Sequence, residues 1–198
     1  MYRFQTLGEF RALLSLYNIG IEEVRGERDG HTYRGLLYTA LNADGEKAEV
    51  TPLKSSLFGK STGFDALERY MEQSGDKITK ENSREYTRHR VAEAFLDAPT
   101  ENALCERLRA YHIDLFIRRN DTGRIVGITF IDHENRCVLN GSRLGKEYSA
   151  NALNERYPEA PKAGADLHGV SNTPQETQIR SAKKAKQPKK KPSKGHKL

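Results

Sequence analysis

The stretch GSRLGKEYSANALNERY, residues 141–157, repeats in outline an earlier stretch of the chain, SSLFGKSTGFDALERY, residues 55–70. When the two are aligned on their Gly-Lys pairs, they agree at Gly, Lys, Ala and Leu with an offset of 86 residues. Each pair stands where a strand is expected to give way to a helix, and such a position needs a flexible turn. We therefore interpret the repeated stretch as a structural joint that the chain uses twice.

The segments that precede the two joints also correspond. LSLYNIGIEEVR, which begins at Leu14, matches LRAYHIDLFIRR, which begins at Leu108, at Leu, Tyr, Ile and Arg with an offset of 94 residues. Between these segments and the joints, Gly35 corresponds to Gly127 with an offset of 92 residues. The offset decreases in order along the chain, as it does when loops shorten between two copies of one unit. The sequence therefore predicts an internal duplication.

Local patterns predict the elements of each unit. Thr6 and Glu9 form a capping box before apolar residues at helical spacing. Asp29 and Gly30 suit a hairpin turn between two extended segments, and a third extended segment is expected near Val50. After Pro99 the order begins again, so each unit is a helix, a hairpin, a third strand and a helix. The expected helices are 7–17, 64–73, 82–96, one around 104–111, and 151–157.

The expected fold class is α+β, with two related units at residues 1–80 and 100–160 and a connecting helix at 81–99. Residues 161–198 form a basic tail that holds ten of the 33 Lys and Arg residues of the chain but two of its 27 acidic residues. This tail has few apolar residues to offset the cost of ordering, so we expect it to be disordered. Its lysines can displace counterions from a nucleic-acid backbone, although a solubilising role is the alternative. The lysines concerned are Lys183, Lys184, Lys186, Lys189, Lys190 and Lys191.

The composition points to a cytoplasmic protein without a cofactor. Cys105 and Cys137 form no CxxC pair, which favours a reducing compartment over a disulfide or zinc framework. No stretch approaches the roughly 20 apolar residues of a membrane span. We expect no membrane association.

Two motifs resemble a phosphate-binding loop and a metal site, but both matches are weak. Gly59, Lys60 and Ser61 resemble the end of a phosphate-binding P-loop, but Lys54 stands where that motif needs its first glycine. The stretch DHENRC, residues 132–137, gathers metal-ligating residue types, yet a hairpin turn uses the same types for local hydrogen bonds. A zinc site needs three or four converging ligands and no second cluster is visible. We predict no metal site and no catalytic residue.

Several stretches resemble the region that follows the catalytic domain in relaxases, the mobilisation nucleases of conjugative and mobilisable elements. The likeness covers about residues 6–157 and rests most on its second half. In that family the preceding domain nicks one DNA strand at the transfer origin, using a Tyr nucleophile and a metal held by a His-x-His cluster. The stretches are FRALLSLYNIGIEEVRGE, YRGLLYTALNADGEK, KSSLFGKS and RRNDTGRIVGITFIDHENRCVLNGSRLGKEYSANALNERY.

The chain contains no His-x-His, so the resemblance implies a relaxase region without the nicking centre and hence no enzyme. It implies an accessory module that binds DNA at the transfer origin, in an undetermined strand state, beside the relaxase catalytic domain and relaxosome proteins. A protein-docking module that connects a relaxase to such partners is the alternative. We expect the folded part of a docking module not to bind DNA and to expose an apolar patch.

Physical chemistry, rather than the resemblance, suggests the contact residues. Lys60 and Lys146 at the two joints, with Ser142 and Arg143 just upstream of the second, could face phosphates at helix N-termini. Ordinary loop polarity is the alternative for all four. Further candidates around the second hairpin are Arg118, Arg119 and Arg124.

Overall fold

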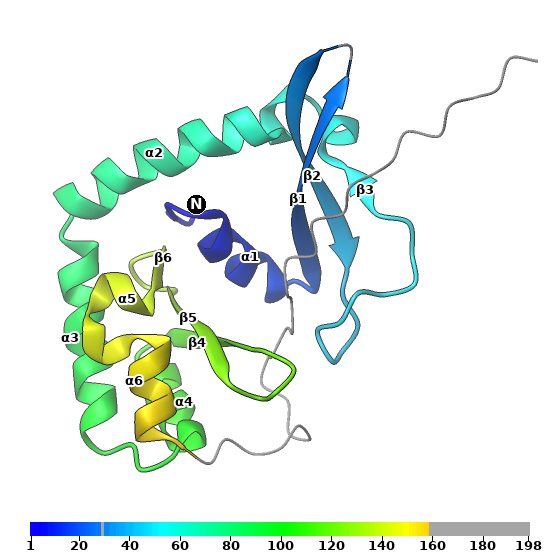
Figure 1. The fold of residues 1–198 in the computed structure, drawn as a ribbon. Coiled ribbons are helices and arrows are strands. Elements are labelled where there is room, and N and C mark those ends of the chain that lie inside the picture. Colours follow the sequence, from blue (N-terminus) through cyan, green and yellow to red (C-terminus); the bar gives the residue numbers. More distant parts are fainter. Residues whose placement is uncertain (29, 159–198) are drawn as a thin grey trace, which may run out of the picture.

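The structure is a computed structural model that describes residues 1–28 and 30–158. Asp29 and the basic tail, including its six candidate lysines, lie outside the described residues. The chain is mixed helix and sheet, as the sequence predicts, with two separate three-stranded antiparallel sheets (Figure 1). No described helix is long and apolar enough to cross a membrane.

The elements follow one another in the same order twice. In the first unit they are α1 (Leu7–Ser15), β1 (Ile19–Arg28), β2 (His31–Ala40), β3 (Leu53–Lys54), the short 3-10 helices η1 (Ser55–Phe58) and η2 (Lys60–Thr62), and α2 (Phe64–Lys80). The helix α3 (Ser83–Leu96) connects the units. In the second unit they are α4 (Glu101–Ala110), β4 (Ile113–Arg119), β5 (Ile125–Asp132), β6 (Cys137–Asn140), α5 (Gly141–Leu144), the 3-10 helix η3 (Lys146–Tyr148) and α6 (Ala150–Arg156).

Local chemistry explains how both units begin. The Thr6 side chain accepts a hydrogen bond from the backbone N–H of Glu9, and the Glu9 side chain accepts one from the backbone N–H of Thr6. This is the capping box that the sequence predicts. Thr100 caps α4 with a single hydrogen bond, in which its side chain accepts from the backbone N–H of Ala103. A left-handed residue then turns each helix into its first strand: Asn18 has φ 56° and His112 has φ 55°. These two residues lie 94 positions apart.

The strand registers correspond as well. Ile21 pairs with Tyr38, and Tyr38 with Leu53. In the second unit, Leu115 pairs with Phe130, and Phe130 with Leu139. These residues are related by the offsets of 94, 92 and 86 found in the sequence.

Two expected boundaries are wrong. The helix α2 continues to Lys80 instead of ending near 73, because no residue before Lys80 interrupts its hydrogen bonding. The third strand starts at Leu53, beyond Val50. Val50 instead donates its N–H to Ala48 in a turn, and Pro52, which has no N–H to give, precedes the strand.

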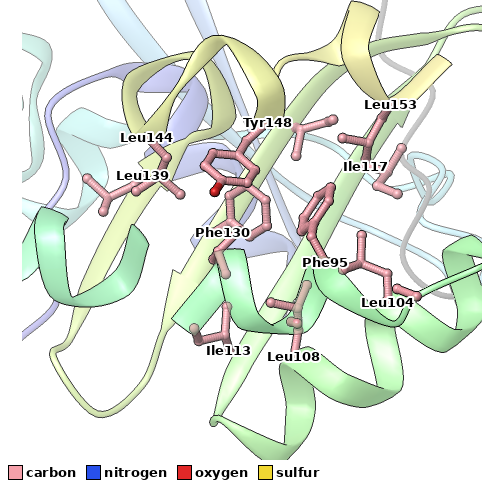
Figure 2. Packing of buried hydrophobic residues seen from close by; sticks show 14 of the residues in the cluster. Phe95, Leu104, Leu108, Ile113, Ile117, Phe130, Leu139, Leu144, Tyr148 and Leu153 are labelled. Atoms are coloured by element: carbon pink, nitrogen blue, oxygen red, sulfur yellow. The ribbon is translucent and has the colours of Figure 1, made fainter. Parts of the chain in front are cut away.

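The second unit contains the largest core. Phe130 and Tyr148 lie at its centre, between the sheet and α3, α4 and α6 (Figure 2). The first unit has a smaller cluster around Ile21, Leu36 and Phe64.

A further cluster joins the two units. It includes Leu13 of α1, Phe116 of β4 and Val138 of β6. The helix α1 therefore lies between the two sheets, and α2 spans from the first sheet to α3 (Figure 1). The unit boundaries at 80 and 100 stay predictions.

Candidate functional site

A cleft of about 580 Å³ opens where α1 meets the second sheet and the joint between β6 and α6. Its walls include Phe116 and Ile128, and its polar lining includes Ser142 and Asn140. Three arginines from distant parts of the sequence reach it: Arg11, Arg118 and Arg124. We call it the basic cleft.

The position of Arg118 depends on the residue opposite. Arg118 pairs with Gly127 in the β4–β5 ladder, and a Cβ at position 127 would lie 3.3 Å from its Nε and Nη2 atoms. The missing side chain therefore gives the guanidinium room to lie across β5. Arg119, the next residue, points to the opposite face of the sheet.

Arg11 approaches from α1 and is half-buried. Its Nε–H donates to the carbonyl oxygen of Ile21 at 3.2 Å. Burial lowers the pKa of the Arg11 guanidinium from its ordinary value, and the positive charge of Arg118 lowers it further, against the opposing effect of Glu22. Two cationic groups thus lie close enough to disfavour each other.

Arg124 is exposed at the start of β5. Its Nη2 donates to Asn151 Oδ1 at 3.0 Å, and its backbone N–H donates to Asn120 Oδ1 at 2.9 Å. These bonds direct the side chain toward the first turn of α6. Arg124 therefore borders the basic cleft beside α6.

Within residues 1–28 and 30–158, no carboxylate forms an ion pair with Arg11, Arg118 or Arg124. Each guanidinium offers several N–H donors in a planar fork that matches phosphate or carboxylate oxygens. An anion between them would relieve the repulsion between Arg11 and Arg118. The arrangement is suited to binding an anionic group over an apolar floor.

The other sequence candidates divide into two groups. Arg119 pairs with Glu101 and also donates to the carbonyl oxygen of Gly123. Arg143 donates at 3.2 Å to Glu9, a fully buried carboxylate. Both arginines therefore have carboxylate partners, whereas Ser142 lines the basic cleft with its side chain exposed.

The lysines at the joints do not lie at α-helix N-termini. Lys146 is exposed and begins η3, while α6 begins only at Ala150, after Ser149. Lys60 begins η2, and α2 follows later. A short helical segment also precedes each Gly-Lys pair, so the expectation that a joint leads directly from strand to helix is wrong.

Arg11 was not among the sequence candidates. It stands among the apolar residues of α1, and no local pattern connects position 11 with position 118. Arg11 and Arg118 come close together because α1 packs on the second sheet. The sequence contains no direct signal for this long-range contact.

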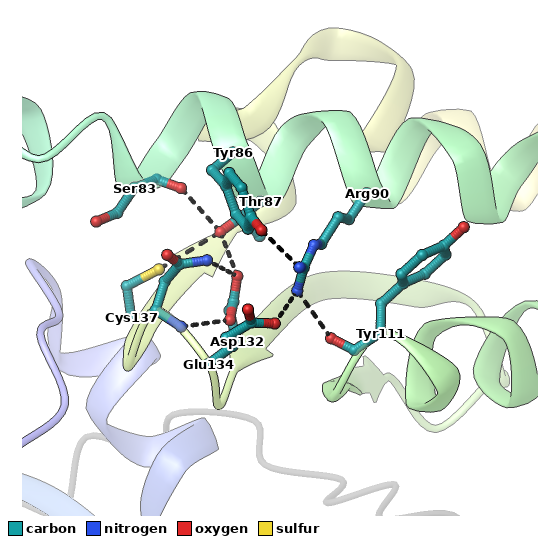
Figure 3. A network of polar contacts seen from close by, with 9 residues as sticks. Ser83, Tyr86, Thr87, Arg90, Tyr111, Asp132, Glu134 and Cys137 are labelled. Carbon is teal, nitrogen blue, oxygen red and sulfur yellow. Dashed lines mark hydrogen bonds and ion pairs between the residues drawn. The ribbon is translucent and has the colours of Figure 1, made fainter.

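The stretch DHENRC anchors α3 to the turn between β5 and β6 (Figure 3). Asp132 is buried and accepts from Thr87 Oγ1 at 2.7 Å and from the backbone N–H of Asn135 at 2.8 Å. Arg90 of α3 pairs with Glu134 in the same turn. In the described part of the chain, no three His, Cys, Asp or Glu residues are grouped as metal ligands would be.

Comparisons with models of known protein families, with curated proteins and with solved structures found no match for this chain. The resemblance to relaxases stays a prediction that rests on the stretches quoted above.

Proposed function

We propose that this chain is an accessory DNA-binding module of a relaxase, which helps to hold or position origin DNA during plasmid or transposon transfer. The observation that supports this most directly is the convergence of Arg11, Arg118 and Arg124 on one cleft, where none of them pairs with a carboxylate of the described residues. DNA presents a phosphate at each nucleotide, and arginine binds phosphate oxygens through paired donors.

The proposal includes an ancestral duplication of one helix–hairpin–strand–helix unit. It is supported by the equivalent left-handed residues, Asn18 and His112, and by the three offsets that recur in the strand registers. The cleft arginines are not themselves duplicated, because Arg118 and Arg124 correspond to Val24 and Thr32. Phosphate binding in this proposal therefore belongs to the second unit, completed by α1.

The proposed module works beside the nicking centre rather than containing it. The sequence lacks the His-x-His cluster, so the relaxase catalytic domain is the partner that would supply catalysis. Relaxosome proteins are further proposed partners, and the proposed location is the cytoplasm. The basic tail would add sequence-independent affinity to that of the cleft.

The test measures DNA affinity of the full chain by fluorescence anisotropy, on single-stranded and double-stranded oligonucleotides. Replacing Arg11, Arg118 and Arg124 together by Gln should weaken binding about tenfold or more and make the salt dependence shallower by roughly two phosphate contacts. Because the basic tail is intact, its contribution is the same in every protein compared.

A matched control removes the same charge elsewhere. Arg69, Arg84 and Arg109 are exposed and lie outside the cleft. Their replacement by Gln should change affinity much less than the cleft substitutions do. Equal losses in both triple variants would mean that only net charge matters, and would overturn the assignment of the cleft.

One observation favours the docking alternative. Leu53, Leu57 and Phe58 of the first unit are large apolar side chains that lie exposed close together in the chain. A docking module is expected to have such a surface.

A further inference from the structure

The second unit shows what covers the end of its sheet. The helix α3 packs there against Leu139, Leu144 and Tyr148, which are 0%, 3% and 6% exposed. The rings of Phe95 and Tyr148 meet edge to face with centroids 5.1 Å apart (Figure 2). This surface is buried because a helix occupies it.

The equivalent residues of the first unit are exposed. The offset of 86 relates Leu139 to Leu53 and Leu144 to Phe58. Leu53 is 48% exposed and Phe58 is 52% exposed, and the neighbouring Leu57 is 69% exposed. We call Tyr38, Leu53, Leu57 and Phe58 the open face.

The open face continues the core of its own unit. Tyr38 pairs with Leu53 across the ladder, and its ring meets that of Phe58 edge to face at 5.9 Å. Tyr38 also packs against the buried cluster of Ile21, Leu36 and Phe64. The first unit therefore has the sheet, the first helix and the last helix of the second unit, but no described helix in the place of α3.

The charges around the two surfaces differ. In the second unit, Glu147 and Glu134 pair with Arg88 and Arg90 of α3. The residue of the first unit that corresponds to Glu147 at the offset of 86 is Ser61, which carries no charge, whereas Glu134 lies in a turn whose counterpart, residues 41–52, has a different length. A helix on the open face would therefore have no carboxylate at position 61 to pair with.

We propose that the open face binds an amphipathic helix of another polypeptide. The helix presents apolar or small residues at the spacing of the buried α3 positions and an uncharged polar residue where α3 has Arg88. The buried positions of α3 that define the spacing are Ser83, Thr87, Val91, Ala94 and Phe95. Contact is apolar, so binding does not depend on salt, unlike binding of DNA to the basic cleft.

The test uses the full chain and a display library of helical peptides. The library keeps the α3 length, replaces Arg88 by Gln, and varies the five buried positions. We expect selected peptides to bind with the same affinity at low and high salt, and about tenfold or more weaker to a Leu53→Ser, Phe58→Ser variant. A Tyr17→Ser, Leu96→Ser variant, which changes two other exposed apolar residues, should bind them normally.

Other results would overturn the proposal. One such result is a library without binders, and another is a set of peptides that bind the Leu53→Ser, Phe58→Ser variant as tightly as the wild type. A third is a wild-type dimer that this variant converts to a monomer in sedimentation, because a second copy of the chain would then be the occupant. Circular dichroism checks that each variant is folded. Peptide binding by the Arg11, Arg118 and Arg124 variant separates this proposal from the proposed function, because the open face does not include the cleft.

Discussion

At the scale of single residues, the arginines of this chain differ in what faces them. Arg143 faces the buried Glu9, whose carboxylate also accepts from the backbone N–H groups of Gln5 and Asn140 at 2.7 and 2.9 Å. Arg11 and Arg118 instead line the same cleft, where the charge of Arg118 lowers the pKa of Arg11. Charge compensation therefore suggests a structural role for Arg143 and a binding role for the other two.

The role of Arg143 can be tested by replacing it with Gln. Because the change leaves a buried carboxylate with less positive charge beside it, we expect the free energy of unfolding to fall by about 3 kcal/mol. Urea unfolding measures this. Arg84→Gln, which breaks an exposed pair with Glu85, should change stability little. A large loss of DNA affinity at unchanged stability would instead support Arg143 as a phosphate contact.

A second prediction at this scale concerns the two cysteines. Burial raises the pKa of the Cys137 thiol to about 12 and that of the Cys105 thiol to about 11, from an ordinary 9.0. Folding thus favours the protonated thiols, and this contribution to stability is present below pH 9.0 and lost as the pH rises toward those values. Unfolding followed against pH should show stability falling above pH 9.0, less steeply in a Cys105→Ala, Cys137→Ala variant.

Iodoacetamide labelling provides a separate check on the thiols. A protonated, buried thiol reacts slowly, so at neutral pH the folded chain should be labelled far more slowly than the chain in urea. Equal labelling rates would contradict the burial of both cysteines.

At the scale of elements, the second joint depends on a close approach. A Cβ at Gly141 would overlap the carbonyl oxygen of Tyr148, so the chain can fold back here only with glycine. We expect Gly141→Ala to lower the free energy of unfolding by about 3 kcal/mol. Gly35→Ala is the control, since a Cβ there meets nothing within 4 Å. Thermal melts of the two variants should differ clearly, and equal melting temperatures would contradict the geometry of the joint.

Most elements could be predicted because their signals are local. The capping box at Thr6 and Glu9, and the recurring joints, all lie within short stretches of sequence. The end of α2 was predicted too early because no residue near position 73 interrupts the hydrogen bonding of the helix. The start of β3 was predicted too early because Pro52, which has no N–H, does not pair with the neighbouring strand. The proximity of Arg11 and Arg118 in the cleft was missed because it depends on how α1 packs on a sheet about 100 residues later in the chain.

At the scale of the whole molecule, the two units are not independent modules. Helix α1 contributes to the core of the first unit, to the cluster that joins the units and, through Arg11, to the cleft. The proposed ligand therefore contacts both units at once. By linkage, a bound oligonucleotide should stabilise the folded chain, and this stabilisation should be lost in the Arg11, Arg118 and Arg124 variant. Melting with and without oligonucleotide measures it, and an equal shift in the variant would argue against the cleft.

The most direct test of the central claim separates the folded body from the basic tail. DNA binding is measured by fluorescence anisotropy for the full chain and for a chain that ends at Pro158, at two salt concentrations. If the basic cleft holds DNA, the shorter chain keeps a salt-dependent affinity that the Arg11, Arg118 and Arg124 substitutions remove. If all affinity is lost with the tail, the cleft does not bind DNA and the body is better explained as a docking platform.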